Sequence, residues 1–520
     1  MKIKYMILAF FAATLSFGAC SSKLDIPRKG VLDKSSYYRV DENILSASAS
    51  LYFEVRGWEY NVILCKNMLT DDFHAGGAAR GDNKDLEQLN EFSFDTQQPY
   101  IENMFKTYYA LVYKANVILE SVDPNVSEVA KMAVAEAHLF RAWAYFDLIT
   151  LWGNPPVVDH QLSPSEYSVG NGETSALWKL VEDDLTAAIS SGALPSKSDI
   201  NDKKTWRVTK EYAAALLGKA YLWMAKDLKD DSYYAKSAYA FEQIISSGKY
   251  DLFKGAEFGD MAQMAYDMNC ESVFDSQRVN DNTNPGDNTT IFVLMTGWRS
   301  DHMEIPDGVT IRNCWGFMLP TKNLYDAFEK YEGKDSYRRK QTMKSFDELR
   351  DMGVKITNDI VSEGFWNWKT RVVSSEVTNS GWRFHRNVHW MRYAEVLLCA
   401  AEAHFRAGNT DKAVKYVNII RERAKLTPLA TVTLDDIKME KRLELVGEAV
   451  RFQDLVRWGD AATALGGNGK TYPVCSPSGV ITLKPTGRTK YGFKSGKHER
   501  LPYPYTETML NKNIKQNLEY

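Results

Sequence analysis

Two stretches of the chain combine aromatic rings with charged and amide side chains close to glycines. A sugar presents hydroxyl groups at its edges and C–H groups on its faces, so a sugar site needs a flat aromatic face with polar side chains around it. We therefore interpret residues 67–85 and 298–317 as candidate sugar-binding segments. Their candidate ligand-binding residues are Asp72, Phe73, Arg80, Asn83, Trp298, Arg299, Asp301 and Trp315.

Both tryptophans also have a purely structural interpretation. Trp298 either contacts a ligand or packs half-buried against the body of the protein. Trp315 opens the stretch "WGFMLPTKNLYDAF", which looks like the packed start of a helix. The sequence leaves these alternatives open.

Other motifs that could carry chemistry stand in the wrong context. Residues 464–471, "ALGGNGKT", fit a loose phosphate-binding loop, but a helix is expected before them and none after, so backbone N–H groups would not face a phosphate. His385 and His389 have a spacing that could hold zinc on a helix, but no third ligand is evident, and we interpret them as surface or capping residues. No nucleophile motif occurs. We therefore predict no catalytic residue, no metal site and no cofactor.

The start of the chain indicates export and lipidation. A short basic segment precedes an apolar stretch that is shorter than the roughly 20 residues of a membrane-spanning helix, as in a secretory signal peptide. Cys20 follows in "FGAC", which resembles the bacterial lipoprotein box. We predict a signal peptide over residues 1–19 and a lipidated Cys20 with a polar tether over residues 20–36. A plain signal peptide and a buried N-terminal helix are the alternatives.

Composition and cysteine usage exclude several classes of protein. The 520 residues carry a net charge of −3, which becomes −5 without residues 1–19, so the basic excess of a nucleic-acid-binding protein is missing. The remaining cysteines are few and widely spaced, which excludes a disulfide framework and a CxxC metal site. Cys65 and Cys399 are expected to be buried small hydrophobes. A single disulfide between Cys270 and Cys314 remains open.

Helical periodicity dominates the first half and the last third of the chain. We expect helices over residues 99–121, 135–152, 174–190, 209–227 and 232–246. The helices come in pairs. The clearest pair, over residues 395–424, has Ala401, Gly408 and Ala413 where a tetratricopeptide repeat needs small residues for close helix approach. Such pairs bury their faces only by stacking, so about four pairs are expected.

Residues 270–320 differ, because they are rich in Gly, Asn, Asp and Pro and contain short β-like runs such as "IFVLM". Long loops of this kind in compact proteins usually carry function. The predicted fold is mainly α: tetratricopeptide-like helix pairs packed with an irregular, loop-rich region containing short strands. We expect a single body over residues 37–520, with helical repeats in 37–270 and loops plus C-terminal helices in 271–520.

The segment 440–460 is dense in charge. Glu448, Arg451, Asp454 and Arg457 recur every three residues, which suits ion pairing along one face of a helix. We interpret these residues as structural ion pairs.

Four segments in this order resemble the SusD/RagB family of nutrient-binding lipoproteins of the Bacteroidetes outer membrane: residues 135–158, 392–424, 440–460 and 501–517. The resemblance covers essentially the whole mature chain. It implies a helical fold with four tetratricopeptide-like pairs, no catalytic activity and a place on the cell surface, at the outer membrane. It also implies a SusC-like TonB-dependent β-barrel transporter as partner, with an oligosaccharide or polysaccharide as the usual cargo.

Two alternatives remain. The chain could be a peptide-binding member of the same family, or a surface glycoside hydrolase on a helical scaffold. The four segments concern the fold and the partner, so the nature of the cargo depends on the candidate ligand-binding residues named above.

Overall fold

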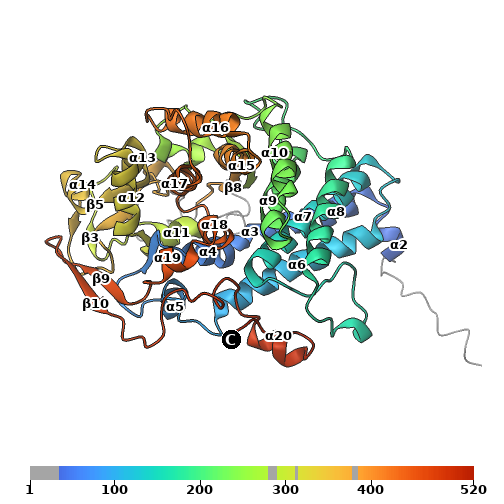
Figure 1. Ribbon diagram of the computed structural model, residues 1–520, viewed down its shortest axis with the longest axis horizontal. Coiled ribbons are helices and arrows are strands. Elements are labelled where there is room, and N and C mark those ends of the chain that lie inside the picture. Colours follow the sequence, from blue (N-terminus) through green and yellow to red (C-terminus); the bar gives the residue numbers. More distant parts are fainter. Residues whose placement is uncertain (1–33, 279–289, 311–313, 377–383) are drawn as a thin grey trace, which may run out of the picture.

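The computed structural model describes residues 34–278, 290–310, 314–376 and 384–520. The predicted signal peptide, Cys20 and most of the predicted tether lie outside these residues. The described chain is mainly α-helical with short strands, which confirms the predicted fold class. In Figure 1 the helical repeats lie on one side of the molecule and the loop-rich part on the other.

The helices of the N-terminal part form most of the repeats, and those of the C-terminal part are shorter. The first group is α2 (Lys34–Tyr37), α3 (Asp41–Arg56), α4 (Leu64–Met68), α5 (Lys84–Asn90), α6 (Pro99–Ser121), α7 (Glu128–Trp152), α8 (Thr174–Ser190), α9 (Lys210–Asp227) and α10 (Ser232–Ile245). The second is α11 (Phe292–Thr296), α12 (Lys322–Glu332), α13 (Tyr337–Thr342), α14 (Phe346–Asp351), α15 (Tyr393–Arg406), α16 (Thr410–Arg423), α17 (Leu434–Glu444), α18 (Arg451–Trp458), α19 (Ala461–Leu465) and α20 (Tyr505–Leu510).

The strands pair two by two, and every pair is antiparallel. The pairs are β1 (Phe73–Gly76) with β4 (Phe317–Pro320), β2 (Ser272–Ser276) with β8 (Val388–Arg392), β3 (Met303–Glu304) with β6 (Lys355–Ile356), β5 (Met343–Ser345) with β7 (Phe365–Asn367), and β9 (Thr471–Cys475) with β10 (Ile481–Pro485). Three of the five pairs join segments more than 50 residues apart. These strand pairs therefore connect distant loops and do not assemble into a larger sheet.

Local sequence explains where the long helices begin and end. α6 starts with Pro99 at its first position, and the side chain of Gln98 accepts a hydrogen bond from the Tyr100 amide at 2.9 Å. α7 starts earlier than predicted because Ser127 caps it by accepting from the Ala130 amide at 3.1 Å. It ends at Gly153, whose φ of 87° continues no helix.

Successive helices pack side by side from α6 to α10, and α15 then packs against α10 to continue the row (Figure 1). α9 and α10 approach closely at Gly218, where a Cβ would lie 2.7 Å from the ring of Phe241. Ala401 and Ala413 are fully buried, as expected for the pair α15 and α16. Gly408 has a different role from the one predicted: its φ is +83° and open space surrounds it, so it forms the turn.

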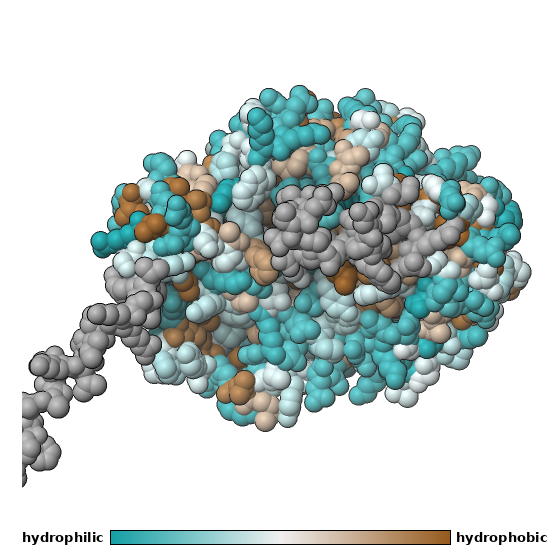
Figure 2. All heavy atoms as spheres, turned by 180° about the vertical axis from the view of Figure 1, so that it is seen from behind, coloured by the Kyte–Doolittle hydropathy of each residue, from teal (hydrophilic) through white to brown (hydrophobic). Residues whose placement is uncertain are grey.

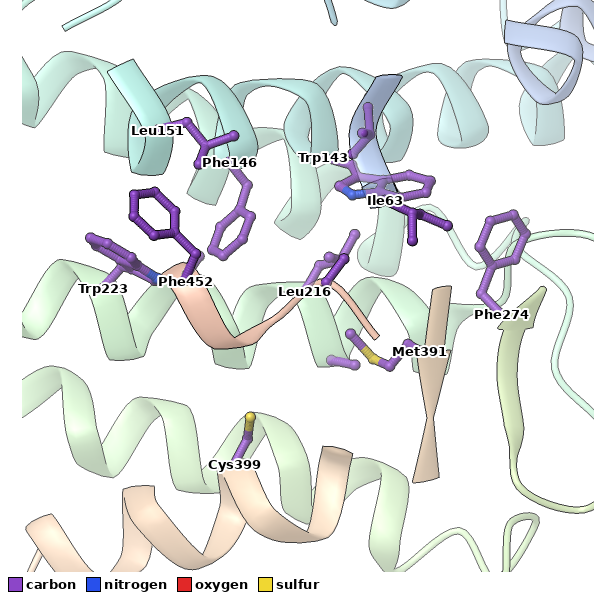
Figure 3. Packing of buried hydrophobic residues seen from close by; sticks show 14 of the residues in the cluster. Ile63, Trp143, Phe146, Leu151, Leu216, Trp223, Phe274, Met391, Cys399 and Phe452 are labelled. Atoms are coloured by element: carbon purple, nitrogen blue, oxygen red, sulfur yellow. The ribbon is translucent and has the colours of Figure 1, made fainter. Parts of the chain in front are cut away.

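One hydrophobic core runs through both parts of the body. Figure 3 shows Trp143 from α7, Leu216 from α9, Cys399 from α15, Phe452 from α18 and Met391 from β8 converging on the same interior. The core therefore binds the loop-rich part to the repeats. Because burying a large apolar side chain stabilises the fold by about 1.5–3 kcal/mol, these shared contacts hold the loops in place.

The charges of residues 440–460 are paired, but of the four predicted residues only Asp454 and Arg457, 3.0 Å apart on α18, pair along one helix. The chain leaves the helical conformation between Glu444 and Arg451, so α17 and α18 are separate. Glu448 pairs with Arg392 of β8 at 2.6 Å, and Arg451 pairs with Asp71 at 2.7 Å. These ion pairs therefore join the C-terminal helices to distant segments instead of stabilising one helix.

Two smaller predictions for the loop-rich part are wrong. The apolar run "IFVLM" contributes to the short helix α11 and does not form a strand, because five apolar residues without alternation fit a buried helical turn as well as a strand. The Thr290 hydroxyl accepts a hydrogen bond from the Phe292 amide at 3.1 Å at the start of this helix. The two histidines thought to be surface or capping residues lie inward: His385 is 3% exposed, and His389 stands on strand β8 with its Nδ1 2.7 Å from Asp275.

The cysteines of the described residues are free thiols. Cys65 and Cys399 are buried, as predicted. Cys270 and Cys314 pack in separate apolar clusters, Cys270 beside Phe253 and Cys314 beside Val293, so the disulfide that the sequence left open does not form. Burial raises the pKa of the Cys314 thiol to about 12, which keeps it unreactive at neutral pH.

The visible surface offers no continuous apolar face. In Figure 2 apolar residues, drawn in brown, form small separate patches among hydrophilic ones wherever the surface is not grey. Within the described ranges, no helix is both long and apolar enough to cross a membrane.

Candidate functional site

The strand pair β1–β4 brings together the two segments that the sequence singled out. Gly76 lies opposite Phe317, and the Gly77 amide donates to the Gly316 carbonyl at 2.7 Å. Both Gly76 and Gly77 have positive φ, and a Cβ on Gly76 would lie 2.3 Å from the Gly316 oxygen. The glycines of this segment therefore permit a close approach that no other residue allows.

Three of the predicted residues, Arg299, Asp301 and Trp315, meet beside this strand pair together with Asp82, which the sequence analysis did not single out. We call these four residues the Arg299 cluster. The Arg299 guanidinium donates to Asp301 from Nε at 2.9 Å and from Nη2 at 3.1 Å. Its Nη1 donates to Asp82 at 2.8 Å and to the backbone carbonyl of Trp315 at 3.2 Å. The Arg299 side chain thus joins three segments: residues 76–83, which we call the glycine loop, residues 298–301 and residues 314–317.

The cluster is charged, ordered and accessible to solvent. The side chains of Arg299, Asp82 and Asp301 are 21%, 30% and 57% exposed. Partial burial alone would raise the pKa of Asp301, but hydrogen bonds from Arg299 and His302 outweigh it and hold that pKa below its ordinary value. Asp301 is therefore ionised at neutral pH and offers hydrogen-bond acceptors to a ligand.

Trp315 supplies the aromatic surface of the cluster. It is half-buried: the Trp315 amide donates to the Leu294 carbonyl at 2.8 Å, and its ring meets Phe317 edge-on with centroids 6.4 Å apart. The backbone and the ring are thus both held, while part of the side chain remains exposed. A fixed aromatic ring beside a charged hydrogen-bonding group is the combination a sugar site requires.

Three of the candidate residues lie in the interior. Trp298 is 1% exposed and its Nε1 donates to the Asn367 carbonyl at 2.8 Å, which favours packing over ligand contact. Phe73 is 2% exposed within the main core. Asp72 is equally buried and pairs with Arg442 at 2.8 Å. These three side chains are therefore part of the packed interior and are not exposed to a ligand.

Arg80 and Asn83 occupy the far end of the glycine loop. Asn83 caps α5 by accepting from the Leu86 amide at 3.1 Å and donates to the Tyr100 hydroxyl at 2.9 Å. Arg80 pairs with Glu91 and lies 5.3 Å from the centroid of the Tyr472 ring. Both residues therefore have structural partners, and neither belongs to the Arg299 cluster.

A polar cavity of about 200 Å³ is lined by part of the predicted segment 67–85, including Phe73 and Arg80, and by residues of 361–363 and 467–473 that the sequence analysis did not propose as ligand-binding residues. His74 and Glu363 meet there at 3.3 Å, and Tyr472 of β9 closes it. Its volume is below the roughly 300–1,000 Å³ of ligand pockets, so it is too small for an oligosaccharide. Tyr472 was hidden because it follows residues 464–471, which drew attention only as an apparent phosphate-binding loop.

A larger cavity of about 1020 Å³ lies on the helical repeats, between α8 and α10 and over α9. Ala214 and Leu217 line it together with three lysines, and Tyr239 stands at its edge with 69% of its surface exposed. None of the candidate ligand-binding residues lines this cavity. Tyr239 is therefore a matched control for experiments on the Arg299 cluster.

The Arg299 cluster can bind a polar ligand that has an apolar face. Two carboxylates held by one guanidinium accept hydrogen bonds in fixed directions, and such charge-assisted bonds are about twice as strong as neutral ones. Arg299 and His302 hold the pKa of Asp301 below its ordinary value, which does not suit the role of a general acid. Among the residues that the structure describes, no group of three His, Cys, Asp or Glu side chains could hold a metal ion.

Two family models match the chain in complementary regions. The model of the SusD family matches residues 355–520, and the model described as "Starch-binding associating with outer membrane" matches residues 32–222. A SusD-like protein of Bacteroides ovatus is 26% identical over 490 residues, with 88% of this chain and 83% of that protein covered. SusD-like protein P2 of Formosa agariphila is 24% identical, with 99% of both chains covered.

Solved structures share the fold over almost the whole chain. A protein described as a laminarin binding SusD-like protein superposes with a TM-score of 0.78 and 25% identity, covering 92% of this chain and 99% of its own. Surface glycan-binding protein A from Bacteroides fluxus superposes with a TM-score of 0.75 and 23% identity, covering 92% of this chain and all of its own. The second likeness concerns the fold alone.

Proposed function

We propose that the chain is a member of the SusD family, whose model matches residues 355–520, and that it is a surface lipoprotein of the outer membrane that binds a glycan and passes it to a SusC-like TonB-dependent transporter. We place the lipid anchor on Cys20. The chain acts by binding, without catalysis. The observation that carries the proposal is the Arg299 cluster, where the side chains of Asp82 and Asp301 and a tryptophan are held at an accessible surface.

The cargo follows from the chemistry of that cluster. Sugar hydroxyls donate to Asp82 and Asp301, and the C–H face of a ring stacks on the exposed part of Trp315. The laminarin-binding description of a relative at 25% identity supports a polysaccharide as cargo. A peptide would need partners for its backbone N–H and C=O groups, whereas the side-chain groups of the cluster are carboxylates and an aromatic ring, which suit sugar hydroxyls and C–H faces.

Affinity electrophoresis tests glycan binding. The mature lipoprotein, purified in mild detergent, is run through gels that contain plant, host or microbial polysaccharides. We expect retardation by one class of polymer, which is recovered intact, and reduced retardation of Trp315→Ala. Tyr239→Ala, which removes an exposed ring from the α10 surface, should migrate like the unmodified protein.

Two results would contradict the proposal. Shortening of the polymer during long incubation would indicate a hydrolase. Retardation by no polysaccharide, combined with binding of a peptide mixture, would indicate the peptide-binding alternative. The partner is tested separately: tagged full-length chain purified from its own outer membranes should bring down a large TonB-dependent barrel, and recovery of the chain alone would argue against the transporter.

A further inference from the structure

Trp206 is unusual because a large part of its aromatic surface is exposed to solvent instead of being packed in the core. Of the tryptophans in the described ranges, it alone has more than a third of its surface exposed, at 46%. It lies in the loop between α8 and α9, in the polar sequence "SDINDKKTWRV", and is not itself a member of the main core cluster. An isolated exposed aromatic residue needs no explanation by itself, so its surroundings decide what it can do.

A buried ion pair fixes the residue next to it. The Arg207 guanidinium donates from Nη1 to both carboxylate oxygens of Glu136, at 2.7 and 2.6 Å, and Glu136 is fully buried in α7. The same guanidinium lies 4.9 Å from the centroid of the Trp206 ring, within the range of a cation–π contact. Arg207 therefore forms a rigid support for the indole.

The backbone before Trp206 is fixed as well. The Asp202 carboxylate accepts hydrogen bonds from the Ser198, Lys204 and Thr205 amides, at 2.8, 2.7 and 3.0 Å. These bonds hold the pKa of Asp202 well below its ordinary value, so the turn keeps its charge and its shape at any physiological pH.

Tyr52 of α3 completes the support. Its ring meets that of Trp206 at an angle of 63° with centroids 5.6 Å apart, and its hydroxyl donates to Glu136 at 2.6 Å. The indole thus rests on two residues that share one buried carboxylate. Holding a side chain in advance removes much of the entropy that binding would otherwise cost.

We propose that Trp206 and Arg207 form a second glycan-contact site, in which a sugar ring stacks on the solvent-facing side of the indole. The exposed Lys203 and Lys204 stand beside it in the chain and supply donors for ring hydroxyls. This inference rests on the proposed glycan binding and extends it to the repeat side of the body. Two contacts on one polymer raise the overall affinity without any new contact at the Arg299 cluster.

The first measurement compares retardation of the mature lipoprotein with that of Trp206→Ala and Tyr239→Ala. We expect Trp206→Ala to bind a long polysaccharide about 3- to 10-fold more weakly, the range of one aromatic contact. Tyr239→Ala should bind normally. Thermal unfolding of Trp206→Ala should match the unmodified protein, since the ring is half in water.

The second measurement reads the ring directly. Iodide quenching of tryptophan fluorescence is recorded with and without the polymer, and the difference between the unmodified protein and Trp206→Phe isolates Trp206. We expect the polymer to protect Trp206 from iodide, also in Trp315→Ala, where the Arg299 cluster is weakened.

The outcomes separate the two proposals. Normal retardation of Trp206→Ala with no protection of Trp206 overturns the second site and leaves the Arg299 cluster intact. No retardation of the unmodified protein by any polysaccharide overturns glycan binding, and the second site with it. Protection of Trp206 with normal binding by Trp315→Ala supports the second site and counts against the first.

Discussion

Arg299 should contribute to binding as well as to stability, and the substitution Arg299→Met measures the two effects separately. Methionine keeps the length of the side chain and removes the guanidinium. Asp82 and Asp301 then lose their shared partner, and the carbonyl of Trp315 loses a donor. The two carboxylates also repel each other once the positive charge between them is gone.

The expected magnitudes follow from exposure. Each ion pair is partly exposed, so each contributes up to about 1 kcal/mol to folding. The free energy of unfolding should therefore fall by about 1–2 kcal/mol. A hydrogen bond between a sugar hydroxyl and a fixed carboxylate contributes about 1.5–3 kcal/mol, so losing the geometry of the site should weaken binding roughly 10- to 150-fold.

Arg350 provides a matched control. It lies on α14 with 61% of its side chain exposed and pairs with Asp347 at 2.7 Å and Asp351 at 3.4 Å. Arg350→Met removes the same charge and the same number of carboxylate partners from another place on the surface. It should leave both retardation in the gel and the unfolding free energy nearly unchanged.

The assay pairs quantitative affinity electrophoresis with urea unfolding for both variants. Equal affinity of Arg299→Met and Arg350→Met for the polysaccharide would refute the assignment of the site. A loss of affinity that merely follows global unfolding of Arg299→Met would refute the separation of binding from stability.

Three further predictions concern the interior. Glu402 pairs with Arg457 at 2.5 and 2.8 Å. Burial alone would raise the pKa of Glu402, but Arg457 outweighs burial and lowers that pKa from an ordinary 4.5 to about 2. The ionised carboxylate therefore adds about 3 kcal/mol to the free energy of unfolding above pH 4.5, and this contribution is lost as the pH falls toward 2. Glu402→Gln should cost about that much at pH 7 in urea unfolding, and a cost that stays equal at pH 2 would contradict the linkage. Trp298→Ala should destabilise the fold by about 3–5 kcal/mol, because its side chain is fully buried. Glycan titration below the unfolding transition should show an unchanged affinity of the folded protein. Weaker binding in that titration would indicate that Trp298 contacts the ligand. Gly77→Ala should destabilise the fold by about 1–2 kcal/mol, because φ at this position is +87°. It should also weaken glycan binding, because the new Cβ would lie 2.7 Å from the Asp82 carboxylate and displace it. Normal binding by this variant would mean that Asp82 does not contact the ligand.

Helix positions could be read from the sequence because they depend on neighbours. α6 and α8 span the predicted residues 99–121 and 174–190, since apolar periodicity, a starting proline and capping side chains all act within one or two turns. For the short apolar run at 291–295 the same reasoning was wrong, because it predicted a strand where most of the run forms the helix α11. Five apolar residues fit a strand and a buried helix equally, so periodicity alone could not distinguish the two.

The sequence by itself determined the helical repeats, the burial of Cys65 and Cys399, and the two segments that carry the candidate site. Only the tertiary structure decided which side chains of those segments face solvent. Arg299 meets Asp82 across 217 positions of sequence because β1 pairs with β4, whereas Trp298, its immediate neighbour, points into the core. The physical reason is that loops rich in glycine and asparagine have no periodicity to mark an inner and an outer face. Their orientation is set by long-range pairing and by the shared core beneath them.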